Sequence, residues 1–140
     1  MGQGIFKSTD LGNTWTPILP VGYAVPGSSE VLGHPSFTKL AIDTSHNPPY
    51  LFVTADFGGS ANRAGVPVSQ GNTANDGLWR SLDGGATWSH YAGSTNFSGC
   101  TFLGGPCPEE DIVIDPANPN QVYVAVAFSG VFRSQDSGNT

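Results

Sequence analysis

The chain has 140 residues, 38% of them apolar, and that apolar share in a chain of this length predicts one folded domain rather than a disordered segment. Only 11% of residues are charged, while 19 glycines and 11 prolines favour short strands joined by turns. The net charge is −6 and the five basic residues are scattered, which excludes a basic face for nucleic acid or for an anionic membrane.

The first predicted element is a strand–turn–strand unit that recurs along the chain. Its copies read KSTDLGNTW at 7–15, RSLDGGATW at 80–88 and RSQDSGNT at 133–140. Each follows a short apolar strand, and each carries Asp and Gly at fixed offsets. Asp can bind nearby backbone amides and Gly can adopt a positive φ, so each copy predicts a tight turn between two strands. We expect the tryptophan that closes the first two copies to anchor the second strand.

A second repeated module lies between these copies. The segments at 37–57 and 110–128 each hold an apolar run, an Asp, an Asn-Pro turn and a run rich in β-branched and aromatic residues. Each therefore predicts a hairpin. Together the modules give nine strands with a four-strand period, which favours a β-propeller built from four-stranded blades. A β-sandwich is the alternative architecture.

The repeated turn, S-x-D-x-G-x-T-W, resembles the Asp-box or BNR repeat. Propellers with this motif include sialidases, xyloglucan-cleaving hydrolases of family 74, sortilin-type receptors and photosystem assembly factors. The resemblance implies an all-β fold: one partial β-propeller domain at 1–140, with about two four-stranded antiparallel blades, a remainder, and boxes at 8–15, 81–88 and 134–140. It also implies that the box residues are structural rather than catalytic; these are Ser8, Asp10, Gly12, Trp15, Ser81, Asp83, Gly85, Trp88, Ser134, Asp136 and Gly138.

Nine strands are too few for the roughly 4 to 8 blades that close a propeller ring. We therefore expect the chain to be part of a larger propeller or to assemble with further copies of itself. Missing blades of such a propeller, or a second copy, are accordingly its expected protein partners.

The long connections predict where chemistry would lie. Segments 20–36, 58–76 and 92–109 should gather on the face away from the boxes, and long loops on a rigid scaffold often carry binding or catalysis. Asp56, in TADFGG, is similar to the catalytic aspartate in the T-D-I-G-G segment of family 74 hydrolases, and Arg63 follows as a binding candidate. Glu109, Glu110 and Asp111 could supply the second carboxyl that an inverting hydrolase needs.

Two cysteines, Cys100 and Cys107, flank a Gly- and Pro-containing stretch that could bring their sulfurs together. A disulfide between them is favoured over two free thiols, and it would indicate a secreted or periplasmic protein. The three histidines lack ligand spacing with the cysteines, so we expect no metal site and no cofactor.

Two functions of different class fit this pattern. The first is a carbohydrate-active, glycoside hydrolase-like propeller that acts on a polysaccharide or oligosaccharide, with no complete active site inside these 140 residues. The alternative is a non-catalytic propeller scaffold for protein binding or assembly. A sialidase site is disfavoured because the chain has three arginines, two of them in box lead-ins, and lacks an F-R-I-P segment.

Overall fold

The computed structural model describes residues 4–20, 24, 36–56, 77–92, 101–102, 105–106 and 109–139, and within this part of the chain all regular structure is β-strand. In chain order the strands are β1 (Gly4–Lys7), β2 (Thr16–Pro20), β3 (Ser36–Asp43), β4 (Tyr50–Asp56), β5 (Gly77–Ser81), β6 (Ser89–Ala92), β7 (Thr101–Phe102), β8 (Gly105–Pro106), β9 (Glu109–Ile114), β10 (Val122–Val126) and β11 (Gly130–Ser134).

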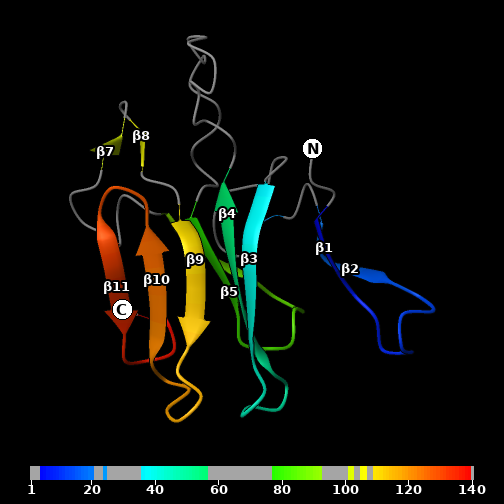
Figure 1. Cartoon of the computed structure of the whole chain (residues 1–140). Coiled ribbons are helices and arrows are strands. Elements are labelled where there is room, and N and C mark those ends of the chain that lie inside the picture. Colours follow the sequence, from blue (N-terminus) through cyan, green and yellow to red (C-terminus); the bar gives the residue numbers. More distant parts are fainter. Residues whose placement is uncertain are drawn as a thin grey trace, which may run out of the picture.

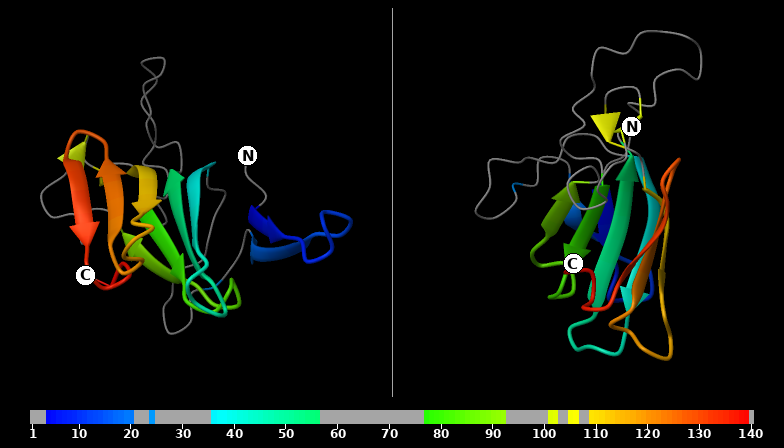
Figure 2. Two further views of the ribbon diagram at one scale, coloured as in Figure 1. Left: turned by 60° about the horizontal axis from the view of Figure 1, so that its bottom comes forward. Right: turned by 90° about the vertical axis from the view of Figure 1, so that its left-hand side faces the viewer.

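Three antiparallel sheets follow one another along the chain. The first sheet pairs β1 with β2, the middle sheet has the order β3-β4-β5-β6, and the last sheet has the order β9-β10-β11. Figure 1 shows the last sheet on the left and the first sheet on the right, and Figure 2 shows the same succession from two other directions. The all-β fold is confirmed, and sheets of two, four and three strands are the expected partial propeller blades.

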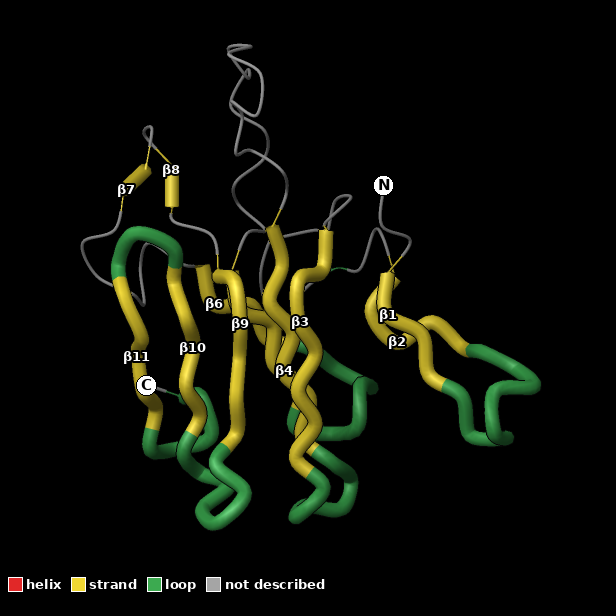
Figure 3. The backbone as a smooth tube through the Cα atoms, viewed as in Figure 1, coloured by secondary structure: helices red, strands yellow, loops and turns green. Residues whose placement is uncertain are grey.

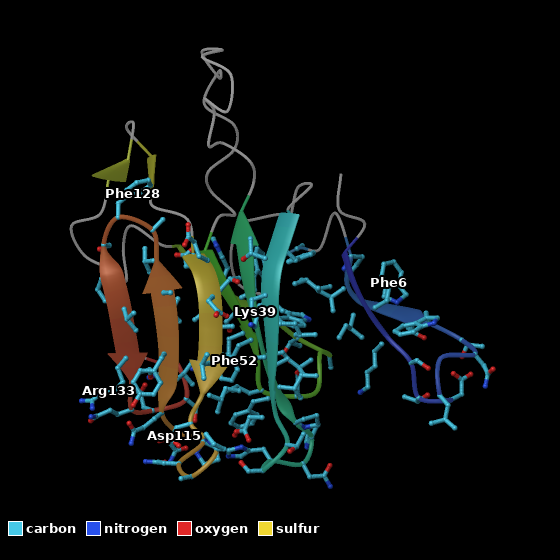
Figure 4. All side chains as sticks on the ribbon, viewed as in Figure 1. Phe6, Lys39, Phe52, Asp115, Phe128 and Arg133 are labelled. Atoms are coloured by element: carbon cyan, nitrogen blue, oxygen red, sulfur yellow. The ribbon has the colours of Figure 1, made fainter. Side chains whose placement is uncertain are left out.

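The middle sheet is buried on both faces. Successive side chains of a strand point to opposite faces, so Leu51, Val53 and Ala55 of β4 face one side while Phe52 faces the other. All four are buried. The first side packs with Leu19, Trp79 and Trp88 into one apolar cluster, which includes the first sheet. Phe52 packs with Leu78, Ile112, Val122, Val124 and Val126 into a second cluster, toward the last sheet (Figure 4).

The strands β3 and β9 bring the middle and last sheets into direct contact. The Thr38 hydroxyl donates to the Glu109 carbonyl at 3.1 Å. Lys39 Nζ lies 3.0 Å from Asp111 Oδ1, with both side chains about half exposed. An exposed ion pair of this kind contributes about 0 to 1 kcal/mol, so the apolar cluster around Phe52 dominates the junction.

The strand ends define two edges of the molecule (Figure 3). One edge, called the Asp-box edge after the predicted motif, carries the repeated turns and the two hairpin turns at 44–49 and 115–121. The loop edge carries the end of β4, the start of β9 and the turn at 127–129. The predicted long connections begin and end at the loop edge, and most of their residues lie outside the described part of the chain.

One small element differs from the sequence prediction. Strands β7 and β8 form a separate two-stranded hairpin inside the segment predicted as a loop at 92–109. Each has only two residues, which is too short for an alternating apolar pattern to reveal.

Candidate functional site

The three turns predicted as Asp boxes share one hydrogen-bond pattern. In the second box the Ser81 hydroxyl donates to Asp83 Oδ1 and accepts from the Gly85 amide, each at 2.8 Å. The Thr87 amide also donates to Asp83 Oδ1, at 2.8 Å. The same Ser-to-Asp and Gly-to-Ser bonds recur at 2.7 to 2.8 Å in the other two boxes. Each box carboxylate thus accepts bonds inside its own turn.

In the first two boxes these bonds favour the ionised form of the carboxyl group. The hydroxyl and amide of Thr14, followed by the hydroxyl of Ser8, lower the pKa of Asp10 to about 2. For Asp83, burial acts to raise the pKa, but hydrogen bonds from Thr87 and Ser81 outweigh it and the pKa is lowered. A carboxyl with a lowered pKa is a poor general acid near neutral pH. The turns therefore have the chemistry of structural acceptors.

We predict that Asp83→Ala lowers the free energy of unfolding at pH 7 by about 1 to 3 kcal/mol, because the buried Ser81 hydroxyl loses its acceptor. The folded pKa of Asp83 lies below the unfolded value of 3.8, so its contribution is present above that pH and lost as the pH falls below it. Urea unfolding should show the variant's deficit shrinking between pH 5 and pH 2. An equal deficit at both pH values, or lost ligand binding at unchanged stability, would contradict this role.

The two box tryptophans do not behave alike, which corrects the expectation that both anchor a strand. Trp88 is 2% exposed, and its Nε1 donates to the carbonyls of Ile18 at 2.7 Å and of Gly85 at 3.2 Å. Trp15 is 61% exposed, and its Nε1 donates at 3.0 Å to Gly12 within its own turn. Trp88 packs in the apolar cluster that joins the first and middle sheets, whereas Trp15 belongs to neither apolar cluster of the described residues.

The loop edge brings two of the predicted acidic residues to neighbouring strands. Asp56 is the last residue of β4, where it pairs with Ser36, and Glu109 is the first residue of β9. Thr38 lies between the two strands: its hydroxyl is 2.7 Å from the Thr54 hydroxyl and 3.1 Å from the Glu109 carbonyl. The backbone at Asp56 and at Glu109 therefore lies at the same edge, although the two residues are distant in sequence.

The acidic cluster is part of a strand, which begins at Glu109, the last residue of the segment predicted as a loop at 92–109. Glu109, Glu110 and Asp111 all belong to β9. Glu109 is fully buried and Glu110 is exposed. The hydrogen bond from Lys39 is the main cause that lowers the pKa of Asp111. Glu110 is thus the most exposed of the three, whereas the half-exposed Asp111 is paired with Lys39.

Phe128 is an aromatic residue at the loop edge that the sequence reasoning missed. It lies in the turn between β10 and β11, has a φ of 61°, and its side chain is 78% exposed (Figure 4). The sequence held a signal for this aromatic position. Phe57 comes directly after β4 in the segment TADF, and Phe128 comes shortly after β10 in the segment VAF. Exposed aromatic faces are common in sites that bind rings or partners.

The other predicted site residues are not placed by the structure. Arg63, Cys100 and Cys107 lie outside the described residues. For Asp56 the described feature is its place in β4. Among the described residues, no three His, Cys, Asp or Glu side chains are grouped to hold a metal ion. Within the same ranges, no helix is long and apolar enough to cross a membrane.

A cavity of about 330 Å³ opens at the Asp-box edge, between the middle sheet and the third box. The rings of His46 and Tyr50 stack on its wall with centroids 3.8 Å apart. Arg80 also lines the cavity, and its Nη1 donates to the Ser137 carbonyl at 2.9 Å. The Ser137 hydroxyl donates to Asn120 Oδ1 at 3.1 Å. Several polar groups of the cavity thus form hydrogen bonds that connect the third box to its neighbours, as expected at a junction between sheets.

Comparison with known proteins gives one informative relative. The chain is similar to a xyloglucanase from Paenibacillus sp., with 32% identity over 155 aligned residues. The alignment covers 97% of this chain and 13% of the xyloglucanase, so the chain spans about an eighth of that relative's length. No protein-family model matches the chain.

Proposed function

We propose that this chain is part of an exported, carbohydrate-active Asp-box propeller of the glycoside hydrolase type, with a polysaccharide as its ligand. The observation that carries the proposal is the similarity to a xyloglucanase along 97% of the chain. The β-sheet architecture supports it, because successive antiparallel sheets of two, four and three strands present loops at one edge of a rigid scaffold. Xyloglucan, the substrate in the relative's name, is therefore the first ligand to test.

The loop edge is the proposed ligand-facing surface. The Asp-box edge is a poor choice, because its carboxylates are bound within their turns and its cavity joins two sheets. At the loop edge, Asp56 would be the catalytic carboxyl and Arg63 a ligand contact. Glu110 is the exposed candidate for a second carboxyl, in place of the buried Glu109. Phe128 would stack against a sugar ring.

Hydrolysis with inversion needs two carboxyl groups roughly 6.5 to 9.5 Å apart, one as general acid and one as general base. Asp56 and Glu110 lie on different sheets, which is how a propeller can place two carboxyls around one glycosidic bond. We do not expect the chain alone to complete this pair in the required geometry. Binding is thus the activity to measure first, and release of reducing ends is the second.

The test is electrophoresis of the native chain in gels with and without xyloglucan. We expect retardation by xyloglucan and a loss of affinity of about fivefold or more in Phe128→Ala, which corresponds to about 1 kcal/mol. Ala117→Asp is the matched control, since Ala117 is exposed in the turn after β9 at the other edge. Equal mobility with and without xyloglucan, or equal retardation of the two variants, would contradict the proposal.

Reducing-end release separates the catalytic from the binding part of the proposal. We expect release by the chain to stay at the level of the blank, with xyloglucan binding of Asp56→Asn close to that of the unaltered chain. Release that Asp56→Asn abolishes would show that the chain holds a complete site. Failure to bind any polysaccharide, together with binding of another protein, would favour the scaffold function instead.

A further inference from the structure

The junctions between sheets repeat one polar contact. Lys7, directly before the first box, donates from Nζ to the Gly84 carbonyl of the second box at 3.4 Å. Arg80, directly before the second box, donates from Nη1 to the Ser137 carbonyl of the third box at 2.9 Å. Gly84 and Ser137 each follow the Asp of their box. Each of these two sheets thus contacts the next through a hydrogen bond from a basic side chain (Lys or Arg) to a box carbonyl, at equivalent positions in the two repeats.

The apolar side chains beside these bases occupy equivalent positions too. In each repeat an aliphatic residue lies two positions before the Lys or Arg, and therefore on the same face of the strand. These residues are Ile5, Leu78 and Val131. Ile5 packs in the cluster between the first and middle sheets. Leu78 is 4% exposed between the middle and last sheets, but Val131 is 71% exposed. This outer face of the last sheet, here the donor face, also carries Arg133 and the half-exposed Val113.

The first sheet shows the complementary surface, here the acceptor face. Phe6 and Trp15 are equivalent in sequence to Trp79 and Trp88 of the next unit. Trp79 and Trp88 are buried against the neighbouring sheet, whereas Phe6 is 44% and Trp15 is 61% exposed. Leu11 follows the box Asp as Gly84 and Ser137 do, and it is fully exposed. Its carbonyl is the equivalent acceptor.

We propose that the donor face of one copy of this chain binds the acceptor face of a second copy. Val131 and Val113 would pack on Phe6 and Trp15, and Arg133 would donate to the Leu11 carbonyl. The reason is continuity, because two junctions inside the chain already use this register and both faces expose the side chains that those junctions bury. The contact joins different faces, so it can extend to further copies or close into a ring.

Sedimentation velocity over a range of concentrations tests the association. The unaltered chain should form reversible species at multiples of 14.6 kDa. Val131→Asp, on the donor face, and Phe6→Asp, on the acceptor face, should each be monomeric. Mixed in equal amounts they should form a dimer and nothing larger, because each variant keeps one intact face. Ala117→Asp, at a turn outside both faces, should associate like the unaltered chain.

Several outcomes would overturn the inference. One is a monomer at every concentration, and another is association that survives in either Asp variant. A mixture of the two variants that stays monomeric would also exclude pairing of these faces. Circular dichroism confirms that each variant folds, and Arg133→Glu, at an exposed position, replaces Val131→Asp if that variant does not. Arg133→Glu should then weaken association at least tenfold, and an unchanged dissociation constant would refute the pairing.

Discussion

Replacing Trp88 with alanine is expected to lower the free energy of unfolding by about 3 to 5 kcal/mol, the range measured for large aromatic side chains in protein cores. Trp88 is 2% exposed and belongs to the apolar cluster between the first and middle sheets. Its removal would open a cavity beside Leu51 and leave the Ile18 carbonyl without the indole donor. Both effects separate the same two sheets.

Trp15 supplies the matched control for this prediction. It has the equivalent position in the first box, yet it is 61% exposed and donates within its own turn. Trp15→Ala should therefore cost less than about 1 kcal/mol in a monomer. Urea unfolding followed by far-ultraviolet circular dichroism measures both variants without relying on tryptophan fluorescence. Equal losses would show that the box tryptophan acts inside its turn and not through the neighbouring sheet.

Gly85→Ala is the second change with a large expected effect. Gly85 has a φ of +95°, and a Cβ there would lie 2.8 Å from Ile18 Cδ1 and 3.1 Å from Ile18 Cβ. The left-handed conformation costs a non-glycine residue about 1 to 2 kcal/mol. Overpacking against Ile18 adds about 1 to 3 kcal/mol, because the first sheet must shift away. We expect a combined loss of about 2 to 5 kcal/mol in equilibrium unfolding.

Gly12→Ala separates the two contributions to this loss. Gly12 has a similar φ of +90°, but the nearest atom to its Cβ is Trp15 Cζ2 at 3.8 Å, an ordinary contact distance. Its substitution should cost only the backbone strain. If Gly12→Ala and Gly85→Ala lose the same free energy, the sheets adjust without cost and the close approach at Ile18 does not hold the junction.

The sequence predicted the strands and turns well because their signals are local. An Asp and a Gly at fixed offsets, between short apolar runs, determine a turn almost regardless of what surrounds it. The two repeated modules therefore predicted the nine strands of the three sheets. The β7–β8 hairpin was missed because two-residue strands carry no periodic pattern.

Burial was harder to predict because it depends on the neighbouring sheet. Trp15 and Trp88 stand in nearly identical local sequences, and only the presence of a packed sheet distinguishes them. Glu109 and Glu110 likewise are adjacent identical residues, yet one is buried and the other exposed, because the register of β9 against β10 shifts here: Val126 pairs with Glu109 and Ala125 with Asp111. Strict alternation counted back from the buried Ile112 would have buried Glu110 and exposed Glu109, because a one-residue shift exchanges the two faces of a strand. The sequence alone therefore could not tell which of these carboxyl groups is exposed, and so could not assign a role to either.

The bond from base to box carbonyl has a consequence for how such repeats can diverge. Its acceptor is a main-chain oxygen, so the bond itself places no demand on the side chain: Leu11, Gly84 and Ser137 differ in size and polarity at the same position, where all three have a positive φ. A side-chain acceptor would require a paired change in two repeats at once. Only the donor must remain a base, as Lys7 and Arg80 are. Duplicated units can thus diverge in sequence, one substitution at a time, without losing the hydrogen bond that connects neighbouring sheets.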